Sequence, residues 1–147
     1  MFQLSPFITV ILKKDNKVLL LKRVNNAKWY PGCFVFPGGK MDGNETVTLA
    51  ACREIKEELG ITLYPEKLKV VHVCHYKRKD GFEGLDFFLL AEAWSGELCN
   101  KEPKKHESIE WIDKDELPKD LIPLHTYALD KINSGSFYSE FGWQTKN

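Results

Sequence analysis

Short apolar runs separated by polar turns fill the N-terminal quarter of the chain. Residues 7–13 and 18–23 are apolar and rich in β-branched side chains, and the residues between them, 14–17, are polar. Two such runs joined by a short polar segment are typical of a β-hairpin. A third apolar run, at 33–36, lies between two Pro-Gly turns and predicts one more short strand.

The same pattern returns in the middle of the chain. Residues 68–76 alternate loosely, residues 85–94 are apolar, and an Asp-Gly pair at 80–81 stands between them, so we expect a second hairpin. Residues 113–117 suggest one helical turn before a proline, and residues 124–132 have apolar side chains at helical spacing. Many strands with few, well-separated helices predict a mixed sheet flanked by helices.

One long helix is expected between Thr46 and Gly60. Thr46 is a suitable N-cap residue, and Gly60 stands where helices commonly end in a left-handed residue. At about 100° per residue, the apolar side chains form a stripe that can pack on a sheet. The stripe contains Leu49, Cys52, Ile55 and Leu59, and we place the carboxylates of this helix on the opposite side.

Three carboxylates lie close together near the end of this helix, on Glu54, Glu57 and Glu58. Like charges three or four residues apart destabilise a helix by a few tenths of a kcal/mol per pair, and only Arg53 and Lys56 are near enough to offset them. Most acidic clusters of this kind face solvent. A divalent cation would relieve the repulsion, and Mg²⁺ is usually held by one or two carboxylates together with phosphate oxygens. The cluster therefore suggests half of a metal-phosphate site.

A pair of glycines, Gly38 and Gly39, offers the other half. A backbone without side chains can adopt positive φ and bring its amides and carbonyls close to a metal or a phosphate. Taken alone, such a pair is most often a simple turn. Its spacing to the helix is more informative, because Gly39 is followed after five residues by Glu45, and after seven more by the run 53–61.

This spacing resembles the signature of the Nudix hydrolase family, G-x5-E-x7-R-E-U-x-E-E-x-G-U, where U is aliphatic. Residues 39–61 fill every specified position, and the preceding WYPGCFVFPGGK and the expected strand order also resemble the family. The resemblance implies an α/β/α sandwich with a mixed β-sheet, formed by residues 1–147 as one domain. It also implies hydrolysis of a nucleoside diphosphate linked to another group, with Mg²⁺ or Mn²⁺ as cofactor.

The resemblance further implies the ligands of the metal. Glu57 and Glu58 would bind it together with the Gly38 carbonyl, and Glu54 would bind it or act as the base for the attacking water. The residues that would brace the glycine loop against the helix are Arg53 and Glu45.

The remaining site residues are expected on loops and strands. A further metal ligand would come from a variable loop, from Glu102 or Glu107, with a slight preference for Glu107. Gly39 and Lys40 would lie against the substrate. The aromatic side chains that could stack a nucleobase are Trp29, Phe34 and Phe87, although large aromatic residues are more often part of a core.

Composition and charge limit the other functions. A chain of 147 residues with 43% hydrophobic residues suits one domain with a real core. Because 21 basic and 21 acidic residues cancel, we expect neither nucleic acid nor a membrane surface as a partner. Four cysteines without a C-x-x-C pair favour free thiols, and the N-terminal segment predicts a strand and not a signal peptide. The expected location is the cytoplasm.

The expected substrate is a nucleoside or deoxynucleoside triphosphate, cleaved to the monophosphate and pyrophosphate. The alternatives are ADP-ribose or a nucleotide sugar on the same fold, and a non-catalytic nucleotide sensor, which the complete set of carboxylates disfavours. No aromatic-Asp-Asp run follows Trp111 to match the family members specific for oxidised purines. The aromatic stretch 135–143 predicts packing over the domain or a homodimer contact.

Overall fold

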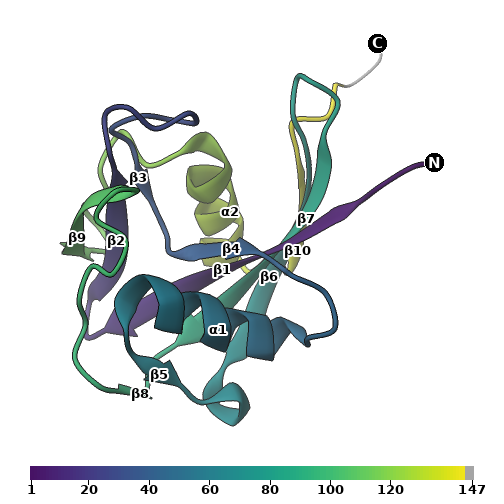
Figure 1. Ribbon diagram of the computed structural model, residues 1–147. Coiled ribbons are helices and arrows are strands. Elements are labelled where there is room, and N and C mark those ends of the chain that lie inside the picture. The colour runs from purple at the N-terminus through teal and green to yellow at the C-terminus, as the bar shows by residue number, and fades with distance from the viewer. Residues whose placement is uncertain (145–147) are drawn as a thin grey trace.

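The fold is built around one long strand, β1 (Ser5–Lys14). The structure is a computed structural model and describes residues 1–144. Figure 1 shows a twisted sheet with helix α1 on one side and helix α2 on the other. The remaining elements are β2 (Lys17–Arg23), β3 (Phe34–Val35), β4 (Gly38–Lys40), α1 (Val47–Leu59), β5 (Thr62–Leu63), the 3-10 helix η1 (Pro65–Lys67), β6 (Lys69–Lys77), β7 (Glu83–Ala91), β8 (Trp94–Ser95), β9 (His106–Asp113), α2 (Pro123–Asn133) and β10 (Tyr138–Phe141).

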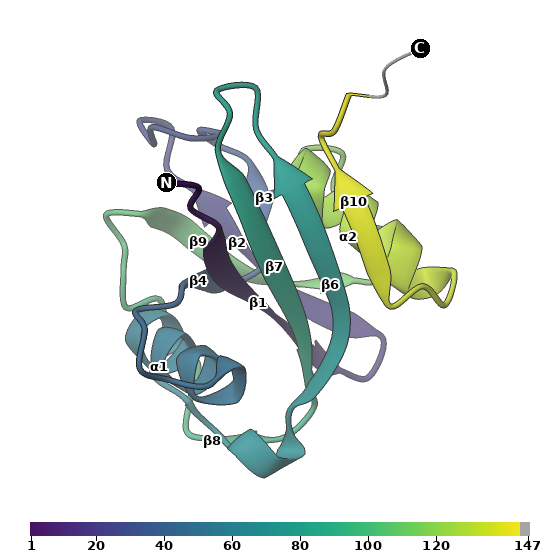
Figure 2. The same cartoon turned by 90° about the vertical axis from the view of Figure 1, so that its right-hand side faces the viewer.

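Strand β1 connects the two halves of the sheet. It runs parallel to β7 and antiparallel to β4, so that Ile8 lies opposite both Phe87 and Gly39. At its end the chain turns through the expected hairpin into β2. The strand order is β10-β6-β7-β1-β2-β3, with β4 beside β1 and β9 beside β2. Figure 2 shows β10, β6, β7 and β1 side by side. The predicted mixed sheet between two helices is confirmed.

Alternating side chains of β1 supply a core to each face of the sheet. Val10 and Leu12 are buried in the cluster that packs against α1, where Ile55 and Leu59 are also fully buried. Ile11 points the other way, into the cluster that includes side chains of α2. Because successive side chains of a strand point to opposite faces, one apolar strand can serve both cores.

Helix α1 begins and ends at the predicted residues. The Thr46 hydroxyl accepts a hydrogen bond from the backbone N–H of Leu49 at 3.2 Å, and Gly60 is left-handed with φ 75°. The predicted apolar stripe is partly wrong, because Leu49 is half exposed. It lies about 120° around the helix from Ile55, whereas Ala51 and Leu59 lie within about 40° of it and are buried.

The strand predictions from apolar runs are confirmed with shifted ends. The run 85–94 is divided, because β7 ends at Ala91 and Trp94 begins β8, which pairs with β5. The predicted helical turn at 113–117 is wrong: Asp113 ends β9, and a turn follows in which the N–H of Glu116 donates to the Asp113 carbonyl at 3.0 Å. All four cysteines are free thiols, as predicted.

Several strands were not predicted. The largest is β9, which pairs with β2 from Lys17–Asp113 to Arg23–His106 and is mostly half-buried. Strand β10 lies at the sheet edge, parallel to β6, and its aromatic side chains pack partly against α2 through Tyr127 and Phe141. Within residues 1–144, no helix is long and apolar enough to cross a membrane.

Two buried titratable side chains lie on the side of the sheet that α2 covers. Thr9 donates a hydrogen bond of 2.8 Å to Asp86, and burial raises the pKa of this carboxyl from its ordinary value of 3.8 to about 7. His125 Nδ1 accepts a hydrogen bond of 3.1 Å from the Phe36 N–H, and burial lowers the pKa of His125 from 6.5 to about 3. Between the pKa of His125 and that of Asp86, both groups are therefore neutral.

The two groups should give opposite pH dependences of stability. Between about pH 4 and 6.5, folded Asp86 keeps a proton that the unfolded chain has lost, so its contribution to stability falls as pH rises. Folded His125 lacks a proton that the unfolded chain binds in this range, so its contribution increases. In urea titrations, the slope of stability against pH should be more positive than the parent's in Asp86→Asn and more negative than the parent's in His125→Asn, each by up to about 1.4 kcal/mol per pH unit.

Glu92→Gln is the control, because Glu92 is exposed just after β7. This variant should keep the slope of the parent. Parallel profiles for the parent, Asp86→Asn and His125→Asn would contradict the assignment.

Candidate active site

Strand β4 passes between β1 and α1 at a distance that only glycine allows. A Cβ atom on Gly38 would collide with the Ile8 carbonyl oxygen, and one on Gly39 would lie 2.6 Å from the carboxyl carbon of Glu54. Neither glycine has positive φ, so that expectation is wrong. The two glycines are required because the backbone of β4 lies directly against β1 and the acidic face of α1.

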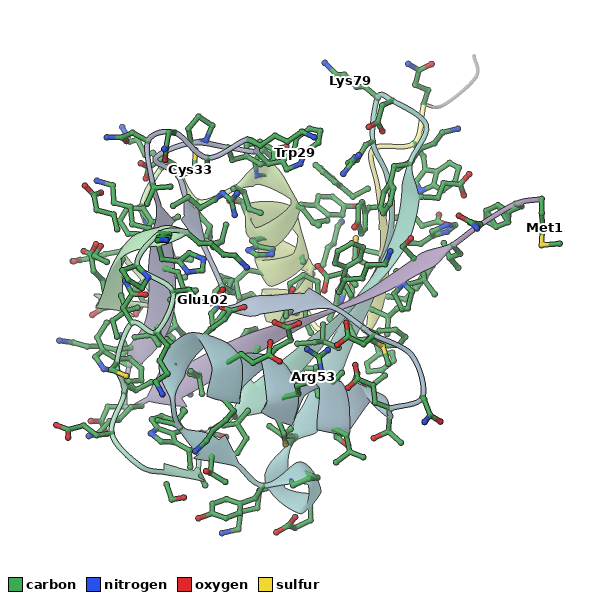
Figure 3. All side chains as sticks on the ribbon, viewed as in Figure 1. Met1, Trp29, Cys33, Arg53, Lys79 and Glu102 are labelled. Carbon is green, nitrogen blue, oxygen red and sulfur yellow. The ribbon has the colours of Figure 1, made fainter. Side chains whose placement is uncertain are left out.

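Arg53 joins this strand to the helix and to the loop between them. Its Nε and Nη2 donate to the two carboxylate oxygens of Glu45 at 3.0 and 2.8 Å, and its Nη1 donates to Glu54 Oε1 at 3.0 Å. Nη2 also donates to the Lys40 carbonyl at 3.4 Å, and Glu57 Oε2 lies 3.5 Å from Nη1. The fork lowers the pKa of Glu45 to about 2. Figure 3 shows Arg53 between α1 and β4.

Glu58 is not on the solvent side of α1, where the sequence placed it. It lies about 60° around the helix from Ile55, at the margin of the buried face, and is 4% exposed. Burial, followed by the nearby carboxylates of Glu54 and Glu102, raises its pKa to about 9, and the backbone N–H of Gly38 opposes the shift. Its Oε2 is buried without a hydrogen-bond partner, which is rare for a native carboxylate.

The structure separates the two loop carboxylates. The charge of Glu102 raises the pKa of Glu58, and Glu102 Oε2 forms an ion pair with the Lys105 ammonium at 2.9 Å. Glu107 is half exposed on β9 and pairs with Lys22 at 3.5 Å. Glu102, and not the slightly preferred Glu107, is therefore the carboxylate next to the acidic end of α1, as Figure 3 also shows.

The donors fit a hard divalent cation, although they do not form a closed cage. Among residues 1–144, no three His, Cys, Asp or Glu side chains are already grouped as metal ligands, and Arg53 instead bridges Glu54 and Glu57. The unsatisfied oxygen of Glu58 and the acidic neighbours that raise the pKa of this group mark a place where positive charge is favoured. Carboxylate oxygens are the ligands that Mg²⁺ and Mn²⁺ prefer.

The three predicted aromatic residues lie on different elements and in different surroundings. Trp29 is half exposed on the loop after β2, and the Arg78 guanidinium lies 4.6 Å from its ring centre. Phe34 is half-buried on β3, with the Lys22 ammonium 5.9 Å from its ring centre. Phe87, on β7, is partly buried and packs against the core cluster that contains Ile55 and Leu59.

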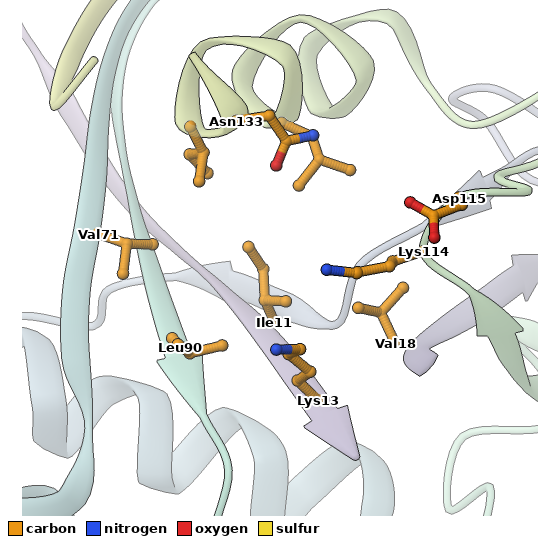
Figure 4. Close-up of a pocket in the computed structure, with 10 residues that line it drawn as sticks. Ile11, Lys13, Val18, Val71, Leu90, Lys114, Asp115 and Asn133 are labelled. Carbon is orange, nitrogen blue, oxygen red and sulfur yellow. The ribbon is translucent and has the colours of Figure 1, made fainter. Parts of the chain in front are cut away.

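Two hollows were not foreseen from the sequence. One, of about 340 Å³, lies where the loop after β2 meets the segment before β9. The other, of about 360 Å³, lies by the C-terminal end of α2, where Figure 4 shows Ile11, Val18 and Leu90 near Lys13 and Lys114. Helix α1 lies on the opposite face of the sheet from this second hollow, which is therefore not part of the acidic site.

Comparisons with known proteins agree with this geometry. The profile of the NUDIX domain matches residues 2–132. An ADP-ribose pyrophosphatase of Methanocaldococcus jannaschii is 38% identical over 118 residues, which cover 79% of this chain and 67% of the relative. An 8-oxo-dGTP diphosphatase of Escherichia coli is 31% identical over 126 residues, which cover 84% of this chain and 95% of the relative.

A solved structure gives the same result. The crystal structure of a MutT NUDIX hydrolase from Burkholderia pseudomallei superposes with a TM-score of 0.79 at 35% identity, covering 88% of this chain and 98% of that one. Nudix enzymes depend on a divalent metal, for which the oxygens of α1 and β4 are suited. The chain therefore belongs to the Nudix family, as a MutT-like pyrophosphohydrolase.

Proposed function

We propose that the protein hydrolyses nucleoside or deoxynucleoside triphosphates to the monophosphate and pyrophosphate with Mg²⁺. The observation that carries this proposal is the buried, unsatisfied oxygen of Glu58 beside Glu54 and Glu102, because a divalent cation that also binds phosphate would stabilise it. The coverage of the relatives supports a triphosphate, since the alignment spans 95% of the Escherichia coli diphosphatase and 67% of the archaeal ADP-ribose pyrophosphatase.

The metal would be held by Glu57, Glu58 and the Gly38 carbonyl, with Glu102 as the loop ligand. When bound, a divalent ion offsets the negative charge of the phosphate oxygens and lowers the pKa of a bound water. Glu54 would accept the proton of the attacking water, and burial, which raises the pKa of this carboxyl above its ordinary value, makes it a stronger base. Water oxygen bonds to phosphorus, the bridging P–O bond breaks, and the leaving group departs as pyrophosphate.

Arg53 positions this machinery in the proposed mechanism. Its guanidinium binds Glu45 in the loop and Glu54 on the helix, and so fixes the position of the glycine strand relative to the Glu54 carboxylate, the proposed general base.

Half-exposed Trp29 and Phe34 remain the candidates for stacking the nucleobase of the substrate. The reducing cytoplasm, which suits four free cysteines, is the proposed location.

The second candidate is hydrolysis of ADP-ribose. The 38% identity to the archaeal pyrophosphatase favours it, and its chemistry requires the same carboxylates. A panel of triphosphates, diphosphates, ADP-ribose and nucleotide sugars, incubated with Mg²⁺ and resolved by ion exchange, decides between the two. We expect pyrophosphate from several triphosphates. Rapid cleavage of ADP-ribose, with negligible pyrophosphate from any triphosphate, would make the second candidate correct.

Glu58→Gln tests the acidic site itself. The amide keeps the shape of the side chain but removes the anionic oxygen, so turnover with Mg²⁺ should fall at least about a hundredfold. Without metal, the melting temperature should equal or exceed that of the parent, because burial and acidic neighbours disfavour the charged form of Glu58 and the amide has no such form. Glu66→Gln, on the exposed helix η1, is the matched control. Full activity of Glu58→Gln would remove this residue from the site.

Arg53→Ala tests the brace. Loss of several charge-assisted hydrogen bonds at a partly exposed side chain should lower the free energy of unfolding by about 2 kcal/mol and reduce kcat. Lys56→Ala is the control, since this lysine is exposed on the same helix and makes only a 3.3 Å contact with Thr62 among its side-chain hydrogen bonds. Equal unfolding curves for Arg53→Ala and the parent would indicate that Arg53 contacts substrate instead.

A further inference from the structure

A cationic hollow lies beside the acidic site. It has a volume of about 340 Å³ and is lined by Arg23, Val24, Asn26, Ala27, Lys28, Lys104 and Lys105. Four of these seven residues carry positive charge and none is acidic. In a chain whose net charge is zero, this is a marked local concentration of cations.

The walls of the hollow are held by the fold. The Arg23 Nε donates to the Trp29 carbonyl at 2.6 Å, which orients the guanidinium. The two segments that form the hollow are joined where the Val24 N–H donates to the Lys105 carbonyl at 3.1 Å. Within the loop, the Val24 carbonyl accepts from the N–H of Ala27 at 3.2 Å. The cations are thus carried on a backbone that is already ordered.

The hollow shares a wall with the acidic site. Lys105 lines the hollow, and its ammonium lies 2.9 Å from Glu102 Oε2. Glu102 in turn acts on Glu58, and Lys105 itself interacts electrostatically with Glu58 and Glu54. A phosphate chain that reaches the acidic end of α1 can therefore continue past Glu102 into the hollow.

We propose that the cationic hollow binds the terminal phosphate of the substrate, beyond the linkage that is cleaved. The proposal rests on the function proposed above, and it makes Arg23, Lys28, Lys104 and Lys105 determinants of substrate class. Guanidinium and ammonium groups bind phosphate oxygens best when no carboxylate competes for them. Within residues 1–144, only Lys105 of these four side chains forms an ion pair, with Glu102.

The hollow explains why a triphosphate is preferred. Beyond the cleaved linkage a nucleoside triphosphate carries a pyrophosphate group, whose terminal phosphate is charged. A nucleoside diphosphate has no such second phosphate, and ADP-ribose ends in an uncharged sugar. A site with four cations gains the most attraction from the first of these three, because only the triphosphate extends one charged phosphate further, so substrate choice follows from charge at the far end of the chain.

The test is binding of inorganic tripolyphosphate to the metal-free protein, measured by calorimetry at low salt. The variant is Lys28→Gln with Lys104→Gln, and the charge-matched control is Lys13→Gln with Lys114→Gln, at the hollow near α2. The first pair should weaken binding at least about tenfold and reduce its salt dependence, whereas the control pair should change it less than about twofold. Melting curves check that both proteins are folded.

Steady-state kinetics with Mg²⁺ give the second measurement. The Lys28 and Lys104 double variant should raise KM for the triphosphate with little change in kcat, and so reduce its preference over the diphosphate. Unchanged tripolyphosphate binding in this variant, with triphosphate hydrolysis intact in the parent, overturns the cationic hollow and leaves the proposed function standing. Failure of the parent to hydrolyse any triphosphate overturns the proposed function and the terminal-phosphate assignment together, whatever the hollow binds.

Discussion

The close approach of β4 to α1 at Gly38 and Gly39 is the constraint on which the site depends. Without side chains at these positions, the strand backbone lies against β1 on one side and against the Glu54 carboxylate on the other. The backbone N–H of Gly38 is also near enough to Glu58 to lower the pKa of its carboxyl. A larger residue at either glycine would move the strand away and return these carboxylates to water.

Basic side chains at both ends of the acidic face of α1 explain how a protein of zero net charge can carry an acidic site. Arg53 offsets Glu45, Glu54 and Glu57 at one end of the acidic face, while Lys105 offsets Glu102 at the other. Glu58, between them, forms no ion pair among the described residues, and Lys105 offsets its charge only partly. The repulsion expected along α1 is thus reduced by Arg53 at Glu54 and Glu57, and it is least offset at Glu58, where a metal ion and a phosphate chain are proposed to bind.

Local signals predicted the elements that form from neighbouring residues. The hairpin of β1 and β2 and the caps of α1 depend on contacts within a few residues, such as that between Thr46 and Leu49, and these were predicted correctly. Strands β9 and β10 were missed because their stability comes from pairing with β2 and β6, far away in sequence, and because edge strands keep polar and half-exposed side chains.

The sequence by itself determined the chemistry: the spacing from Gly39 to Ile61 identified the family, and the residue types on α1 indicated a metal and phosphate site. Only the tertiary structure decided which carboxylates are buried, that Glu102 and not Glu107 lies beside Glu58, and that two distant segments form one cationic hollow. The physical reason is that helix phase and spacing are local properties, whereas burial and electrostatic proximity depend on which segments the sheet brings together.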